Sequence, residues 1–423
     1  MSEINTNLFE QLGTLFFILA ILHTFLVKQF QKIASRYPEG SIKENLFHLF
    51  GEVEVVFGLW AGIFILSAVL CVDLKMAMEY LNTRDYKEAL FVFVIMVICS
   101  TKPILELVRT LISVFAKLIP LKRNFSIYLS CMLLGPILGS FITEPAAMTV
   151  TALFLLNFMF RQKVSNKAKY LTLGLLFVNI SIGGTLTPFA APPVLMVAGK
   201  WNWDLFFMLT NFGWKAGLSI LLSTLIVMFF IRKDLKELKF KVDHNEKLPM
   251  WVIVLHILFL VLVVLTHTQP IVFFGLFLFF LGLVTVTKEF HEELKLKESL
   301  LVAFFLGGLV VLGGPQKWWL QGLISHLSVL GLYFGSIGLT SFTDNAALTF
   351  LGSQVENLSD LSKYALVAGS VVGGGLTVIA NAPNPAGYSI LNGSFGEQGI
   401  APLYLFLGAL LPTAVAALFF FPY

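Results

Sequence analysis

The chain has 423 residues, of which 57% are hydrophobic and only 13% are charged, and its formal net charge is +4. A water-soluble domain carries roughly 25% charged residues, so this composition excludes a soluble globular protein. We expect membrane lipid as a partner and no nucleic acid.

Apolar runs recur along the whole chain, and many approach the roughly 20 residues that cross a bilayer as a helix. Five examples are 8–27, 55–72, 205–231, 251–266 and 271–287. The first ten residues include acidic side chains and no basic ones, so we expect no cleavable signal there. The pattern predicts an all-α polytopic membrane protein.

Most of the 29 Lys and Arg residues fall in alternate loops, which the positive-inside rule assigns to the cytoplasm. These loops lie near 28–43, 117–123, 161–169, 232–247 and 288–297. The alternation requires 124–160 and 318–357 each to enter and leave on one side, as re-entrant hairpins. We therefore expect both termini outside, in a bacterial inner (cytoplasmic) membrane.

Two phrases recur in the same order in the two halves of the chain. "SFITEPAAMT" (140–149) is similar to "SFTDNAALT" (341–349), and the phrases align on Glu144 and Asp344. "GGTLTPFAAPP" (183–193) is similar to "GGGLTVIANAP" (373–383). The recurrence predicts a duplicated chain.

Each half is predicted to contain about five spans, one of them interrupted, and one hairpin. Because five is odd, the second half is inverted relative to the first, as in many secondary transporters. The first repeat covers 1–231, with its hairpin at about 124–160 and its interrupted span at about 170–198. A cytoplasmic linker (232–249) precedes the second repeat (250–423), with its hairpin at about 318–357 and its interrupted span at about 363–391.

Prolines predict where the interrupted spans break, because proline removes a backbone donor and clashes with the preceding turn. They are Pro188, Pro192, Pro193, Pro383 and Pro385. In lipid, unwound backbone persists only where it lines a cavity, and its free carbonyls and helix ends can hold ions.

The hairpin tips carry the carboxylates of Glu144 and Asp344. A charged carboxylate at bilayer depth costs roughly 2.5–3.5 kcal/mol on insertion scales, so two such groups indicate a function. A structural alternative is that they start the following helix, since Thr-Glu-Pro and Thr-Asp-Asn suit helix N-termini. The two roles are compatible.

At these residues the chain resembles the ion transporter superfamily, which includes sodium/proton antiporters, arsenite permeases and divalent-anion/sodium symporters. "GGGLTVIANAPN" (373–384) is similar to the loop of the antiporter branch. More narrowly, the chain resembles the bacterial putative sodium/proton antiporter family. The resemblance implies a homodimer whose hairpin tips and unwound loops meet near the midplane. The polar residues of the hairpin tips and the loops that the resemblance implies give the cation-binding candidates Thr143, Thr149, Thr343, Asn345, Thr349, Thr187, Thr377, Asn381 and Asn384, beside Glu144 and Asp344.

The chain also departs from its dicarboxylate-transporting relatives. Those carry Ser-Asn-Thr at the hairpin tips, where this chain has Thr-Glu-Pro and Thr-Asp-Asn. Two carboxylates would repel a dianion, by about 4 kcal/mol for a close pair at intermediate dielectric. Ala191 in the first loop matches Asn381 in the second, so the two sites are chemically unequal.

These patterns favour a transporter, not an enzyme, that exchanges a monovalent cation, sodium first, for protons by alternating access. Asp344 is the first choice for coordinating sodium, and Glu144 is its symmetric partner and the alternative proton carrier. Sodium and protons are the transported species, and no cofactor is expected. The alternatives are an anion permease for dicarboxylate or arsenite, a passive channel, and an intramembrane enzyme, for which no zinc or serine-protease motif is found.

Overall fold

The computed structural model describes residues 3–239, 248–396 and 399–423, and within these ranges it contains helices and no strand. The chain forms two compact units, and neither coincides with one half of the sequence. Unit 1 comprises Met1–Phe93, Leu296–Leu327 and Phe350–Leu358, and unit 2 comprises Val94–Lys295, Ser328–Thr349 and Ser359–Tyr423. Residues 240–247 of the predicted linker lie outside the described residues.

Unit 1 is built around helices α1, α3 and α16, which pack on one another. A Cβ on Gly308 of α16 would overlap the backbone nitrogen of Gly58 in α3, so glycine lets the two main chains touch. The helices of this unit are α1 (Glu3–Ala34), α2 (Ile42–Phe50), α3 (Val53–Cys71), α4 (Leu74–Asn82), α16 (Leu296–Gly313), η5 (Gly314–Gln316) and α17 (Lys317–Ile324); α5 (Lys87–Cys99) and α19 (Asn345–Ser353) run from one unit into the other.

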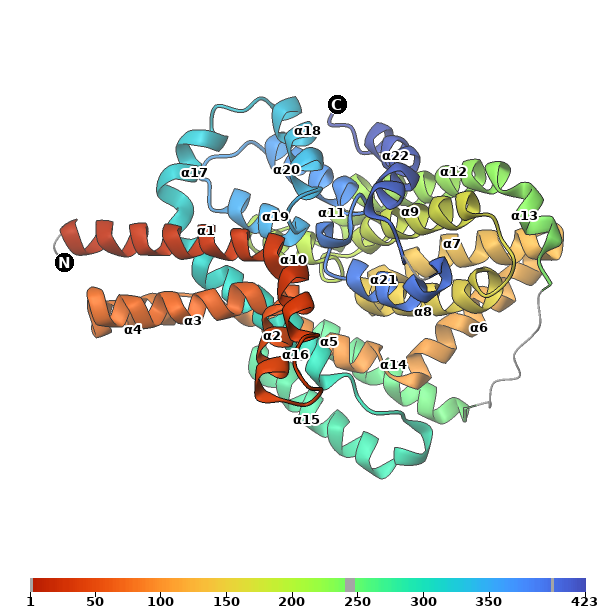
Figure 1. Ribbon diagram of the computed structural model, residues 1–423, viewed down its shortest axis with the longest axis horizontal. Coiled ribbons are helices and arrows are strands. Elements are labelled where there is room, and N and C mark those ends of the chain that lie inside the picture. Colours follow the sequence, from red (N-terminus) through yellow and green to blue (C-terminus); the bar gives the residue numbers. More distant parts are fainter. Residues whose placement is uncertain (1–2, 240–247, 397–398) are drawn as a thin grey trace. The chain divides into compact units, whose positions relative to one another are not determined.

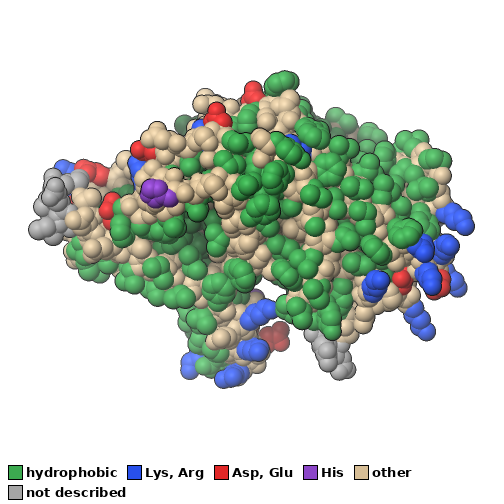
Figure 2. Space-filling model, turned by 90° about the horizontal axis from the view of Figure 1, so that it is seen from above, with side chains coloured by type: hydrophobic (Ala, Val, Ile, Leu, Met, Phe, Trp, Pro, Cys, Tyr) green, Lys and Arg blue, Asp and Glu red, His purple; other side chains and the backbone are tan. Residues whose placement is uncertain are grey.

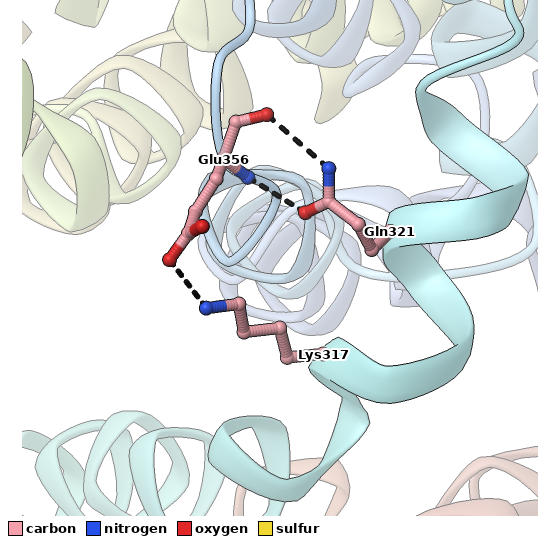
Figure 3. A network of polar contacts seen from close by, with 3 residues as sticks. All are labelled: Lys317, Gln321 and Glu356. Atoms are coloured by element: carbon pink, nitrogen blue, oxygen red, sulfur yellow. Dashed lines mark hydrogen bonds and ion pairs between the residues drawn. The ribbon is translucent and has the colours of Figure 1, made fainter.

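Helix α17 is tied to the segment that follows α19 by three side chains (Figure 3). Lys317 forms an ion pair with the exposed carboxylate of Glu356. The side-chain oxygen of Gln321 accepts a 2.9 Å hydrogen bond from the backbone nitrogen of Glu356, and its amide nitrogen donates to the Glu356 carbonyl at 3.4 Å. The contact between α17 and this segment therefore consists of hydrogen bonds to the main chain of Glu356 as well as of an ion pair.

Unit 2 contains the remaining helices. They are α6 (Lys102–Leu118), α7 (Arg123–Ile142), α8 (Glu144–Leu155), η1 (Leu156–Phe160), α9 (Asn166–Gly183), η2 (Gly184–Leu186), α10 (Pro192–Trp201), α11 (Leu205–Met208), η3 (Leu209–Gly213), α12 (Trp214–Phe230), α13 (Arg232–Glu237), α14 (Met250–Leu265), α15 (Pro270–Val286), η4 (Lys288–Phe290), α18 (Val329–Thr340), α20 (Asp360–Gly373), η6 (Val378–Ala380), α21 (Asn384–Asn392), η7 (Gly393–Phe395) and α22 (Pro402–Phe419).

Within unit 2, α7 packs on α6, α8 and α9, α18 packs on α20, and α9 packs on α22. A Cβ on Gly174 of α9 would overlap the carbonyl carbon of Gly408 in α22, so these two backbones also touch. Helix α21 lies beside α8 (Figure 1), although more than 200 residues separate them in sequence. This neighbour relation brings the second interrupted region to the start of α8.

Among the described residues, seven helices are long and apolar enough to cross a membrane, and an eighth is counted if α5 and α6, bent by 68°, form one span. Large hydrophobic side chains such as Leu70, Phe206 and Phe279 are exposed, and hydrophobic side chains cover most of the face in Figure 2. Large exposed apolar surfaces mark membrane or protein interaction sites, and together with the apolar helices they agree with a membrane location. The prediction of an all-α polytopic membrane protein is confirmed.

Several boundaries differ from those expected. Helices α14 and α15 have 16 and 17 residues, fewer than a typical span. Helix α7, in the first predicted hairpin, has 20 residues and can cross a membrane by its length alone. The second predicted hairpin begins at about 318, but α17 belongs to unit 1 and α18 begins only at Val329. The inverted repeats and re-entrant hairpins stay predictions.

Candidate functional site

Glu144 is the first residue of α8, and its side chain is fully buried in unit 2. Pro145 follows it in the first helical turn, where a proline needs no backbone donor. The positive end of the helix dipole favours a carboxylate there. In the described part of the chain, no Lys, Arg or His forms an ion pair with Glu144. Such a buried charge is costly unless a proton or a cation neutralises it.

Thr143 joins α7 to α8 in a strained backbone conformation. Its φ of 72° and ψ of 150° lie near a region that is almost exclusive to glycine, and a β-branched residue there costs roughly 1–3 kcal/mol. The Thr143 hydroxyl is buried, and no described residue forms a hydrogen bond with it. Strain and an unused polar atom next to Glu144 both indicate a functional position.

Asn381 connects the second interrupted region to Glu144. Its Nδ2 donates a 2.7 Å hydrogen bond to Oε2 of Glu144, and both side chains are buried. In the part of the chain that the structure describes, the other carboxylate oxygen, Oε1, and the amide oxygen of Asn381 have no hydrogen-bond partner. A Cβ on Gly184 would overlap Oε1 and lie 2.7 Å from Cγ of Glu144, so glycine makes room for the carboxylate.

The first interruption separates α9, which ends at Gly183, from α10, which begins at Pro192. Ser140 of α7 holds it in place. The Ser140 hydroxyl donates to the Gly183 carbonyl at 2.6 Å and accepts from the Leu186 nitrogen at 2.9 Å. The Thr187 hydroxyl donates to the Ser140 carbonyl at 2.6 Å. These bonds satisfy part of the backbone that leaves the helix.

The second interruption separates α20, which ends at Gly373, from α21, which begins at Asn384. The Thr377 hydroxyl donates to the Ser341 carbonyl at 2.9 Å. The Asn384 amide donates to the carbonyls of Gly374 and Thr377, both at 2.8 Å. Its Oδ1 is buried and has no hydrogen-bond partner in the described part of the chain. Asn384 therefore fixes the loop and still offers an oxygen.

The five predicted helix-breaking prolines all lie at these two interruptions. Pro188 is in the first loop, Pro192 and Pro193 begin α10, and Pro383 and Pro385 flank the first residue of α21. Four of the five thus stand where a new helix starts, a position at which proline is well tolerated.

Asp344 immediately precedes α19 and is half-buried. Its Oδ1 accepts hydrogen bonds from the backbone nitrogens of Ala346 at 2.8 Å and Ala347 at 3.1 Å. This is the geometry of a helix N-cap, the structural role that the sequence left open. The like charges of the Asp344 and Glu144 carboxylates repel each other.

Asn345 is the first residue of α19 and is fully buried. Within residues 3–239, 248–396 and 399–423, neither its amide oxygen nor its amide nitrogen has a hydrogen-bond partner. A Cβ on Gly374 would lie 2.8 Å from Nδ2 of Asn345 and would overlap the Ser181 hydroxyl. Glycine thus leaves room for Asn345, much as Gly184 leaves room for Glu144.

The remaining three candidate threonines donate their hydroxyl hydrogens to backbone carbonyls one turn earlier. Thr149 donates to Pro145 at 2.9 Å, and Thr343, which is partly exposed, donates to Leu339 at 3.0 Å. Thr349 donates to Asn345 at 3.2 Å and Ala346 at 3.1 Å. Their oxygens retain lone pairs, but among the described residues no hydrogen bond joins these threonines to Glu144.

A family model described as "Putative Na+/H+ antiporter" matches residues 8–422. The chain belongs to the putative Na+/H+ antiporter family. No protein with a curated description matches it. The match spans nearly the whole chain, so both interrupted regions and both carboxylates lie inside it, and the narrower of the two resemblances is confirmed.

In this antiporter-family chain, the structure joins only some of the predicted site residues. Glu144 and Asn381 are in contact, and Thr143 and Asp344 are near, whereas Asn345 and Asn384 lie around Gly374. The sequence did not lead us to select Ser140 or Ser341 as site residues. The two serines open the repeated phrases, which is a signal that could have found them. Nothing in the sequence marks Gly184 as a neighbour of Glu144.

Proposed function

We propose that the protein exchanges sodium for protons across the membrane by alternating access, and that both ions compete for Glu144. The proposal rests on the burial of this carboxylate without an ion pair among the described residues. A buried carboxylate is stable when a proton or a cation neutralises it. Binding of one ion then requires release of the other, which couples the two fluxes.

The oxygens around Glu144 support a hard cation as the cargo. Hard cations take oxygen ligands from carboxylate, amide and hydroxyl groups. Oε1 of Glu144, Oδ1 of Asn381 and the hydroxyl of Thr143 are buried, and none has a hydrogen-bond partner among the described residues. Sodium would lose water on entering such a site and regain oxygen contacts from these groups.

Inverted repeats are part of the proposal, because they provide two similar half-sites that can open in turn. Matching contacts support them. Thr187 donates to the Ser140 carbonyl in the first half, and Thr377 donates to the Ser341 carbonyl in the second. The corresponding loops of the two halves are thus held by the same kind of hydrogen bond, to Ser140 near the end of α7 and to Ser341 just after α18.

The experiment uses purified protein in proteoliposomes with a pH-sensitive dye inside. We expect sodium pulses to move protons in the opposite direction for the wild type. E144Q should lose at least 99% of this flux while its thermal stability is retained, because an amide cannot exchange a proton for sodium. E39Q, at an exposed glutamate, is the matched control and should behave as the wild type.

Unchanged exchange in folded E144Q would contradict the proposal. A second contradictory outcome is uptake of a dicarboxylate or arsenite without sodium-dependent proton movement, which would make the protein an anion permease. Radiolabelled uptake in the same vesicles detects it.

A further inference from the structure

The contacts around the two interruptions indicate which residues of the helix pair α7–α8 correspond to which residues of the helix pair α18–α19. We call this correspondence the register. A Cβ on Gly183 would lie 2.6 Å from the carbonyl oxygen of Pro136, and a Cβ on Gly373 would lie 2.6 Å from that of Ile337. Pro136 of α7 and Ile337 of α18 therefore occupy matching places against the ends of α9 and α20.

Two further contacts repeat in the same register. Ser140 stands four residues after Pro136 and accepts from Thr187, and Ser341 stands four residues after Ile337 and accepts from Thr377. Four residues later still come Glu144 and Asn345, which face Gly184 and Gly374 respectively. The three pairs of contacts thus give the same sequence offset between the two helix pairs, and this offset aligns Glu144 with Asn345.

The helix starts follow the same register. Glu144 is the first residue of α8, and Asn345 is the first residue of α19. Thr143 and Asp344 each precede the helix, and Asp344 accepts hydrogen bonds from its first turn. The phrase "SFITE" has one residue more than "SFTD", so aligning the two carboxylates shifts the second helix pair by one position.

We propose that Asn345, and not Asp344, takes the place of Glu144 in the second helix pair, so that one carboxylate per chain exchanges ions. Asp344 is a positioning residue: it caps α19 and thereby holds Asn345 beside Gly374, where the second interruption begins. The inference rests on the proposed function of Glu144. Asn345 offers a cation a neutral amide oxygen, and because it does not ionise, it releases no proton when the cation binds.

The loop residues differ between the halves in the same sense. Asn381 donates to Glu144, whereas the residue at the matching place in the first loop is Ala191, whose methyl group has no donor. The ionisable side chain of Glu144 therefore has a hydrogen-bond donor beside it, whereas the corresponding loop residue of the other half offers no donor. The asymmetry agrees with one ion-exchanging carboxylate, not two.

The test counts protons released when sodium binds to detergent-purified protein, by calorimetry in buffers of different ionisation enthalpy. We expect no more than one proton per chain for the wild type and the same number for D344N and D344S. Asn and Ser cap a helix nearly as well as Asp, whereas Ala does not. D344A should therefore lower the melting temperature, which D344N and D344S should restore.

Exchange in proteoliposomes completes the test. D344N and D344S should keep sodium-driven proton flux within tenfold of the wild type, with sodium affinity a few-fold weaker because a nearby negative charge is gone. Release of two protons per wild-type chain, or loss of proton release in folded D344N and D344S, would overturn the inference. Neither result would contradict the proposed role of Glu144. Retained exchange in E144Q would overturn the proposed function instead.

Discussion

Nδ2 of Asn381 lies 2.7 Å from Oε2 of Glu144, so that a loop residue of the second half holds the buried carboxylate of the first. The contact joins the interrupted region before α21 to the start of α8. Any movement that separates these two segments must break a charge-assisted hydrogen bond in a buried setting. The contact therefore links the state of the carboxylate to the position of the loop.

N381A tests this contact. A hydrogen bond to a charged group contributes about 1.5–3 kcal/mol, and the substitution also removes an oxygen from the candidate cation site. We expect the sodium concentration for half-maximal exchange to rise roughly tenfold or more, with the protein still folded. N82A, at an exposed asparagine of α4, is the control. Equal sodium affinity in N381A and wild type would show that the bond has no part in transport.

G184A tests the room left for the carboxylate. An added Cβ would overlap Oε1 of Glu144 and force the side chain to move. We expect exchange to fall more than tenfold, because the ion-exchanging group would leave its place. G217A makes the same change in α12 where no atom lies within 4 Å, and it should keep full exchange. Comparable rates for the two variants would argue against a fixed position for Glu144.

T143G tests the strained junction. Glycine removes a strain of roughly 1–3 kcal/mol and adds an entropic cost of about 0.5–1 kcal/mol, so we expect net stabilisation of about 1 kcal/mol. Exchange should fall, because the buried hydroxyl is lost. T110G, at an exposed helical position of α6, should instead destabilise by a few tenths of a kcal/mol. Melting temperatures of the two variants should move in opposite directions, and a fall in both would refute the strain.

His291 tests a pH effect away from the carboxylates. It lies in the loop after η4, its Nε2 is 2.9 Å from the Thr287 hydroxyl, and burial lowers its pKa below the ordinary value. The unfolded chain therefore binds this proton more readily, and stability is lost as the pH falls below about 6.5. H291Q should reduce the loss of melting temperature between pH 7.5 and 5. An identical loss in H291Q and wild type would exclude this histidine.

Much of the arrangement around Glu144 could be predicted from sequence because it depends on local chemistry. Prolines close together in apolar sequence predict where helices break, and Pro188 and Pro192 lie at such a break. A glutamate inside a long apolar run predicts burial, and Glu144 is fully buried. Helix length could be predicted less well, since capping and packing decide where α14 and α15 end.

The proposed match of Glu144 with Asn345 did not follow from the sequence, because a carboxylate stands at the neighbouring position and the two carboxylates align with each other. Tertiary contacts, such as the hydrogen bond from the Thr377 hydroxyl to the Ser341 carbonyl, favour the match with Asn345. The hydrogen bond between Asn381 and Glu144 could not be predicted either. It joins residues far apart in the chain, and no local sequence pattern indicates that they meet.

The touching main chains of α9 and α22 have a practical consequence. With Gly174 against Gly408, a side chain added at either position would force the two helices apart at this point, whereas elsewhere along the pair the rings of Tyr170 and Tyr404 pack against each other. Spectroscopic labels on these two helices should therefore be attached away from Gly174 and Gly408, because a label at either glycine would itself separate the helices.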